Sequence, residues 1–155
     1  MKKWLYFLTG LFVVGALGTD SSAGKDVGKL QPVQVVCLSY ADGKVRIWTD
    51  TGDAGSGPDL MAAVGDMSAA AASEIFLEMA DYLLVSRDCL ALLQDAAGVL
   101  RPSCSVCLMD GQPDMERVGQ YLTLHIPQIT LMEYRAGEQS LQTLKTTDGR
   151  MTLVS

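Results

Sequence analysis

The residues most suggestive of chemistry are the two cysteines of a C-x-x-C motif, Cys104 and Cys107, in the stretch RPSCSVCLMD (101–110). In a redox site the first cysteine of this motif lies at a helix N-terminus, where the helix dipole and free N–H groups lower the thiol pKa. The sequence around this motif instead predicts a strand, and side chains three residues apart in a strand point to opposite faces of the sheet. We therefore expect two sulfurs that neither meet each other nor share a metal ion.

The other two cysteines, Cys37 and Cys89, do not complete a zinc site. Their spacing matches no zinc-knuckle pattern, and His125 is the single histidine of the chain. We interpret all four cysteines as small buried apolar side chains, because free cysteine is among the most buried residue types. The alternative is a disulfide, since an exported chain meets an oxidising environment, and its first candidate joins Cys37 to Cys104 or Cys107 across neighbouring strands. No metal ligands and no cofactor are predicted.

A glycine-rich segment, TGDAGSGPD (51–59), is the second place where a ligand could bind. It lacks the G-K-[ST] ending of a phosphate-binding loop, and its aspartates would repel an anion. Those aspartates also do not follow the spacing of a calcium-binding loop. We interpret the segment as a mobile loop. If the domain binds a small molecule, the candidate loop residues are Gly52, Asp53, Gly55, Ser56 and Gly57.

Catalytic groups are not recognisable in this sequence. A nucleophile needs a base that activates it, and His125, which precedes Ile126 and Pro127, has no recognisable partner. Glu74 and Glu78 are four residues apart on a candidate helix, a spacing typical of a solvated face. We therefore expect a protein without enzymatic activity.

The elements that position these residues are preceded by a segment with the pattern of an export signal. Two lysines come before an apolar run over 4–17, and small residues at its end favour cleavage after Gly18. An uncleaved anchor is the alternative, although the run is shorter than the roughly 20 residues that cross a bilayer as a helix. Residues 1–18 are thus predicted to be a signal peptide or membrane anchor, and the small, polar residues 19–31 a flexible tether.

The net charge and the length of the chain limit the kinds of partner and the number of domains that it can have. The formal net charge of −6 argues against a nucleic-acid partner, because phosphate recognition needs clustered lysine and arginine. Residues 32–155 are enough for one domain that buries a core without disulfides. We expect an exported, extracytoplasmic protein.

The apolar patterns of this domain predict alternating strands and helices. A first hairpin is expected over 33–40 and 45–50, and a last one over 140–145 and 150–154, each around an Asp-Gly turn. Strands separated by helices need crossover connections, which are typical of sheets with parallel members. We predict an α/β fold, with α+β as the alternative: a mixed β-sheet flanked by helices in a single domain. The segments expected between the hairpins are helices at 60–72, 86–100 and 114–122 and strands at 82–85 and 103–109.

Over residues 33–154 the order of these elements and several residue types resemble the N-terminal domain of the C subunit of bacterial spore-germination receptors, the Ger(x)C family. In that family a signal precedes a strand pair, a Gly- and Ser-rich loop, a helix, an apolar strand, a second helix, a further strand and a short helix. The matching stretches here are VQVVCLSYADGKVRIWTD, TGDAGSGPD, LMAAVGDMSAAA, ADYLLVSRDCLALLQDAAGVL and SCSVCLMDGQPDMERV. The chain resembles a short form of the family, since members are two to three times longer and the resemblance here covers only their first domain. It also departs from the family in VVGALGTDSS, which lacks the lipobox cysteine that members carry after the signal.

The resemblance implies a non-enzymatic, extracytoplasmic and membrane-associated protein whose partners are the membrane-embedded germination-receptor subunits. It supplies no functional residues, and it indicates no oligomeric state. A second hypothesis is an extracytoplasmic protein that binds a small molecule, such as a germinant, through the loop 52–57 at the end of a strand. A third hypothesis is a thiol redox or metal-binding protein.

Overall fold

The computed structural model describes residues 32–138 and 140–155, so the signal predicted for 1–18 and the tether predicted for 19–31 lie outside the described residues. The first described element is the expected hairpin of β1 (Val35–Ala41) and β2 (Lys44–Thr49). Its turn residues, Asp42 and Gly43, have φ values of 54° and 73°, the left-handed conformations that a two-residue hairpin turn requires. This hairpin is confirmed.

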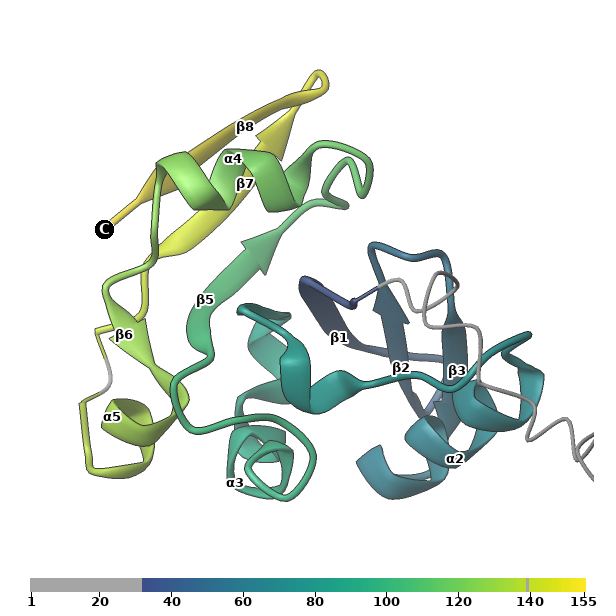
Figure 1. Ribbon diagram of the computed structural model, residues 1–155. Helices are drawn as coiled ribbons and strands as arrows, with labels where there is room; N and C mark the ends of the chain where they lie inside the picture. Colours follow the sequence, from purple (N-terminus) through teal and green to yellow (C-terminus); the bar gives the residue numbers. More distant parts are fainter. Residues whose placement is uncertain (1–31, 139) are drawn as a thin grey trace, which may run out of the picture. The chain divides into compact units, whose positions relative to one another are not determined.

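The strands form one mixed sheet in the order β3-β2-β1-β4-β5-β7-β8, with β6 beside β5 (Figure 1). β1, β4, β5 and β7 run parallel to one another, and an antiparallel pair closes each end. The predicted mixed sheet of an α/β domain is confirmed. The remaining strands are β3 (Ala54–Gly57), β4 (Tyr82–Val85), β5 (Ser105–Asp110), β6 (Ile129–Thr130), β7 (Thr143–Thr147) and β8 (Arg150–Val154).

The helical segments differ more from the prediction. The prediction of a continuous helix over 86–100 is wrong. The segment is a 3₁₀ helix, Arg87–Leu92, followed by the short helix α3, Leu93–Ala96. The buried residues of this segment include Cys89, Leu93 and Ala96, so contacts with the sheet determine its backbone more than helix propensity does. The other helical segments are α2 (Leu60–Ala70), a 3₁₀ turn at Leu77–Met79, α4 (Val118–Leu124) and α5 (Leu131–Arg135).

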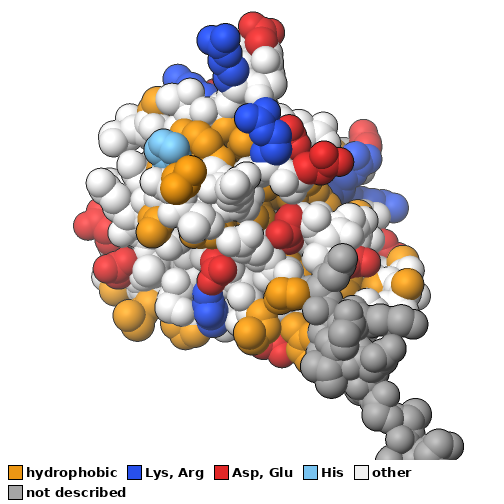
Figure 2. All heavy atoms as spheres, turned by 45° about the horizontal axis from the view of Figure 1, so that its top comes forward, with side chains coloured by type: hydrophobic (Ala, Val, Ile, Leu, Met, Phe, Trp, Pro, Cys, Tyr) orange, Lys and Arg blue, Asp and Glu red, His pale blue; other side chains and the backbone are white. Residues whose placement is uncertain are grey.

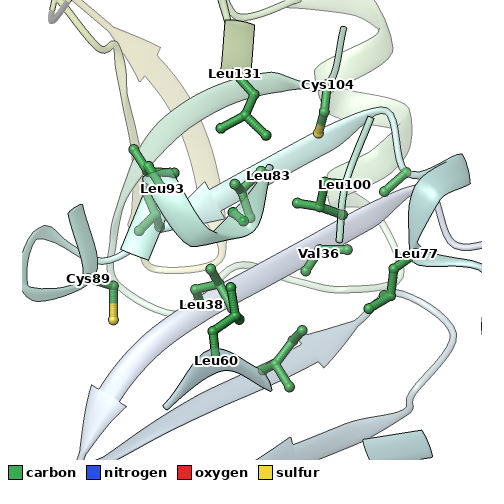
Figure 3. Close-up of a cluster of buried hydrophobic side chains, with 14 of the residues drawn as sticks. Val36, Leu38, Leu60, Leu77, Leu83, Cys89, Leu93, Leu100, Cys104 and Leu131 are labelled. Atoms are coloured by element: carbon green, nitrogen blue, oxygen red, sulfur yellow. The ribbon is translucent and has the colours of Figure 1, made fainter. Parts of the chain in front are cut away.

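The two faces of the sheet are covered unequally. Alternate residues of β1 point to opposite sides, so that Val36 and Leu38 belong to one core cluster and Val35 and Cys37 to the other. We call the side with Val36 the first face; α2, α3 and α5 supply its covering residues (Figure 3). We call the side with Val35 the second face, and its one covering helix among the described residues is α4.

None of the helices within 32–138 and 140–155 has the length and apolar character needed to cross a membrane. α2 is the longest of them, with Leu60, Ala63 and Met67 buried on the first face. Its N-terminus is capped by Asp59, whose carboxylate accepts a hydrogen bond from the Ala62 N–H at 2.8 Å.

Candidate functional site

The C-x-x-C motif lies in the core, on both sides of the sheet. Cys104 belongs to the cluster of the first face and Cys107 to that of the second, so the predicted separation of the two sulfurs is confirmed. All four cysteines are buried, as expected from their interpretation as small apolar residues. Figure 3 shows Cys89 and Cys104 among the leucines that fill the first face.

Burial also suppresses the chemistry of these thiols. Desolvation raises the pKa of Cys104 to about 12, and the pKa of Cys107 likewise to about 12. The pKa values of Cys37 and Cys89 are raised for the same reason. Since the thiolate is the nucleophile and the metal ligand, none of these groups is poised to react near neutral pH. Within the described part of the chain, no three His, Cys, Asp or Glu side chains are grouped to hold a metal ion.

The disulfide alternative is wrong, because the four cysteines are free and the sheet register keeps the candidates apart. Cys37 and Cys107 both lie opposite Leu84 in β4, one on each side of it. Two strand spacings separate them by roughly 10 Å, whereas a disulfide needs Cα atoms within about 7 Å. Cys104 lies on the other face of the sheet from Cys37. Instead, the Cys37 Sγ lies 3.8 Å from the Sδ of Met115.

The glycine-rich segment is not a mobile loop through its whole length. Gly52 and Asp53 form a tight turn, closed by a 2.9 Å hydrogen bond from the Thr49 N–H to the Asp53 carbonyl oxygen. Gly55, Ser56 and Gly57 belong to the edge strand β3. The loop interpretation of these three residues is therefore wrong.

The glycines of β3 allow a close approach of strand and helix. A Cβ on Gly55 would lie 2.3 Å from the carbonyl oxygen of Ala63, and one on Gly57 would lie 2.6 Å from its backbone nitrogen. Ala63 is part of α2. The absence of side chains at these two positions thus serves packing rather than a flexible ligand loop.

The second face is hollowed over β2 and β3. The segment 111–117 and α4 cover its other strands, through Met115 against Cys37 and through the buried residues Val118 and Leu122. A groove of about 690 Å³ remains beside this cover. We call it the β2–β3 groove; its lining includes Ser39, Arg46, Trp48, Ser56, Met109 and Gln112.

The polar side chains of this groove include one basic and one acidic residue, Arg46 and Asp66. The indole Nε1–H of Trp48 is buried and has no acceptor among the described residues. Arg46 donates from Nη2 to the Asp42 carboxylate at 2.8 Å, in an ion pair whose side chains are both well exposed. Asp66, at the rim, accepts a 2.9 Å hydrogen bond from the backbone N–H of Ser56.

Sequence reasoning placed only part of this groove. Of the candidate loop residues, Gly55 and Ser56 line it, whereas Gly52 lies at a neighbouring hollow. Arg46 and Trp48 lie in the predicted second strand of the first hairpin, which assigned them no role in binding. A tryptophan on the solvent side of a half-buried strand was the one sequence signal that could have indicated the groove.

A second surface feature lies at the end of α4. Leu124 and Ile126 are 76% and 63% exposed, on either side of His125. The His125 ring stacks on that of Tyr121, with centroids 4.3 Å apart. Figure 2 shows hydrophobic side chains next to the pale-blue histidine. We call Leu124, His125 and Ile126 the α4 patch.

The groove extends over the face of the sheet and reaches the carboxyl ends of two parallel strands, the end at which α/β sheets often bind ligands. Ser39 is near the carboxyl end of β1 and Met109 near that of β5, two parallel strands of the sheet. Comparison with protein-family models, with curated proteins and with solved structures finds no match to this chain. The β2–β3 groove and the α4 patch are thus the two candidate binding surfaces of the described residues.

Proposed function

We propose that this protein is an exported, non-enzymatic interaction module that associates with a membrane-bound spore-germination receptor. The resemblance to the Ger(x)C N-terminal domain motivates the proposal. The order of elements in the described domain supports it, because a hairpin, a helix, a strand, a helical segment, a strand and a helix follow one another as the resemblance implies. The residues proposed to direct export are 1–18.

The observation that carries an interaction role is the α4 patch. α4 already buries Val118 and Leu122 against the sheet, so Leu124 and Ile126 are apolar residues beyond those that the fold uses. Full burial of a leucine or isoleucine side chain contributes about 1.5–3 kcal/mol. Since Leu124 and Ile126 are 76% and 63% exposed, a partner that covers both would gain roughly 2–4 kcal/mol of apolar burial, before the costs of association.

The patch is also held in a fixed position. The backbone N–H of His125 donates to the Tyr121 carbonyl oxygen at 3.0 Å, and the His125 Nδ1 lies 3.0 Å from the same oxygen. The Tyr121 hydroxyl accepts a hydrogen bond from the Leu153 N–H at 3.0 Å, which ties α4 to β8. Little ordering is then needed when a partner binds.

The test is retrieval of the receptor from spores. Affinity-tagged protein, in detergent-solubilised spore membranes, is expected to retrieve the multi-spanning subunit of a germination receptor. Leu124→Ser with Ile126→Ser should reduce the amount retrieved at least tenfold. The matched control is Met61→Ser with Met79→Ser, which removes two apolar side chains of similar exposure, 63% and 54%, from other elements.

Circular dichroism of each variant checks that the fold is intact. Retrieval of no receptor subunit by the unmodified protein would contradict the proposed association. Equal retrieval by the patch variant and the control would instead contradict the assignment of the α4 patch as the contact surface.

A further inference from the structure

We infer that the β2–β3 groove is a binding site for a small aromatic carboxylate, a function separate from the proposed association with a receptor. The inference rests on the shape of the groove, on one flat aromatic side chain within it, and on one charged hydrogen-bond donor, the Arg46 guanidinium.

The shape of the groove follows from small side chains on the second face. Register places Ser39 opposite Arg46 and Arg46 opposite Ser56, while Ala54 lies opposite Trp48. The small side chains of Ser39, Ser56 and Ala54 leave space between the larger Trp48 of β2 and Met109 of β5. The resulting volume of about 690 Å³ falls within the roughly 300–1,000 Å³ of small-molecule sites. A one-ring or two-ring acid fits this space.

Trp48 and Met109 provide surfaces for the aromatic part of the ligand. Both side chains are half-buried and line the groove from different strands, β2 and β5. Flat rings pack on an indole in offset or edge-to-face arrangements, which contribute about 0.5–1.5 kcal/mol beyond apolar burial. A thioether adds favourable contact with a ring edge. This pair therefore favours a planar ligand over a branched aliphatic one.

Arg46 provides the donors for the carboxylate. The Trp48 Nε1–H is covered by protein atoms, so the indole contributes its ring surface to the groove and not a donor. The guanidinium of Arg46 has five donors, and its pairing with Asp42 through Nη2 leaves others for a second carboxylate. This ion pair is exposed and correspondingly weak.

Asp66 is the acidic residue of the lining and would oppose an anion. Its Oδ2 is occupied by the Ser56 N–H, on the outer edge of β3. We therefore place the carboxylate at the Arg46 side of the groove and the ring against Trp48 and Met109. Because the lining holds one acidic and one basic side chain, we expect it to bind a monocarboxylate with modest affinity and not to bind a polyanion.

The indole N–H of Trp48 gives a direct readout. The chain has two tryptophans, Trp4 and Trp48, so a full-length Trp4→Phe protein shows a single indole cross-peak in a ¹H–¹⁵N spectrum. Titration with 2-naphthoate should move this cross-peak saturably, and 2-naphthamide should bind at least tenfold more weakly. Arg46→Gln should weaken binding of the acid at least tenfold and leave the amide unchanged.

Two further variants complete the test. Ala54→Leu fills the groove and should abolish the shift for both probes, whereas Lys145→Gln removes a positive charge outside the groove and should change neither. An indole cross-peak that does not respond to 2-naphthoate overturns the inference. A response that persists in Ala54→Leu, or that is equally strong in Arg46→Gln, also overturns it, because the acid would then bind elsewhere or without the proposed donors.

Discussion

Replacing Gly55 with alanine is expected to destabilise the domain by about 3 kcal/mol, the upper part of the usual range for overpacking. The new Cβ would lie 2.3 Å from the Ala63 carbonyl oxygen and 2.4 Å from the Met67 backbone nitrogen. Both neighbours are backbone atoms of α2, so no side-chain rotation can relieve the contact. The strand and the helix must therefore separate.

The magnitude follows from how far they must move. α2 has to shift by about 0.7 Å before the shortest contact reaches 3.0 Å. A gap of 0.5–1 Å removes roughly a quarter to a half of the dispersion attraction between packed atoms. The affected residues include Ala63 and Met67, both completely buried, and Ile47 of the neighbouring strand.

The same substitution at Gly65 is the matched control. Gly65 lies on the exposed side of α2, and a Cβ there would meet no atom within 4 Å. Alanine in a helix interior is roughly 0.5–1 kcal/mol more favourable than glycine, so Gly65→Ala should stabilise the domain. Urea denaturation followed by circular dichroism measures both changes. A loss below about 1 kcal/mol in Gly55→Ala, or shifts of the same sign in both variants, would refute the proposed contact of β3 with α2.

Two further predictions concern stability. Burial raises the pKa of Cys107 to about 12 from an ordinary 9.0. As the pH rises, the thiol therefore ionises in the unfolded chain before it ionises in the folded one. The stability present below pH 9 is lost as the pH rises toward 12. Urea midpoints measured against pH should show this loss, and Cys107→Ala should make it smaller; an unchanged slope would contradict the burial. Thr130→Ala removes the capping box of α5 and should cost about 1 kcal/mol in the same assay, whereas Thr123→Ala, on the exposed end of α4, should cost less.

The hairpins were predictable because their signals are local. Asp42-Gly43 and Asp148-Gly149 each form a two-residue turn with positive φ at both positions, and each is followed at once by the expected strand. The strand 82–85 was equally clear, since a fully buried parallel strand reads as a short continuous apolar run. In these segments local sequence and tertiary packing favour the same conformation.

The strand β3 was missed because local sequence and packing disagree there. Two glycines in four residues indicate a loop, yet pairing with β2 and contact with α2 make the segment extended. The capping box of α5 was a usable local signal, since Thr130 and Glu133 have the required spacing before a helix. The β2–β3 groove has no local signal of this kind, because it depends on where the segment 111–117 crosses the second face.

Unequal covering of the sheet explains why the groove adjoins the segment 111–117 and the patch lies at the end of α4. Three helices contribute to the core of the first face, whereas on the second the seven-residue helix α4 and the segment before it reach only part of the strands. Where this cover stops short of β2 and β3, the groove remains, and where α4 ends, Leu124 and Ile126 remain exposed. A longer α4 is not needed for stability, because Val118 and Leu122 of this helix already complete the core around Leu84 and Cys107. The groove and the patch can therefore be altered separately without a change in that core.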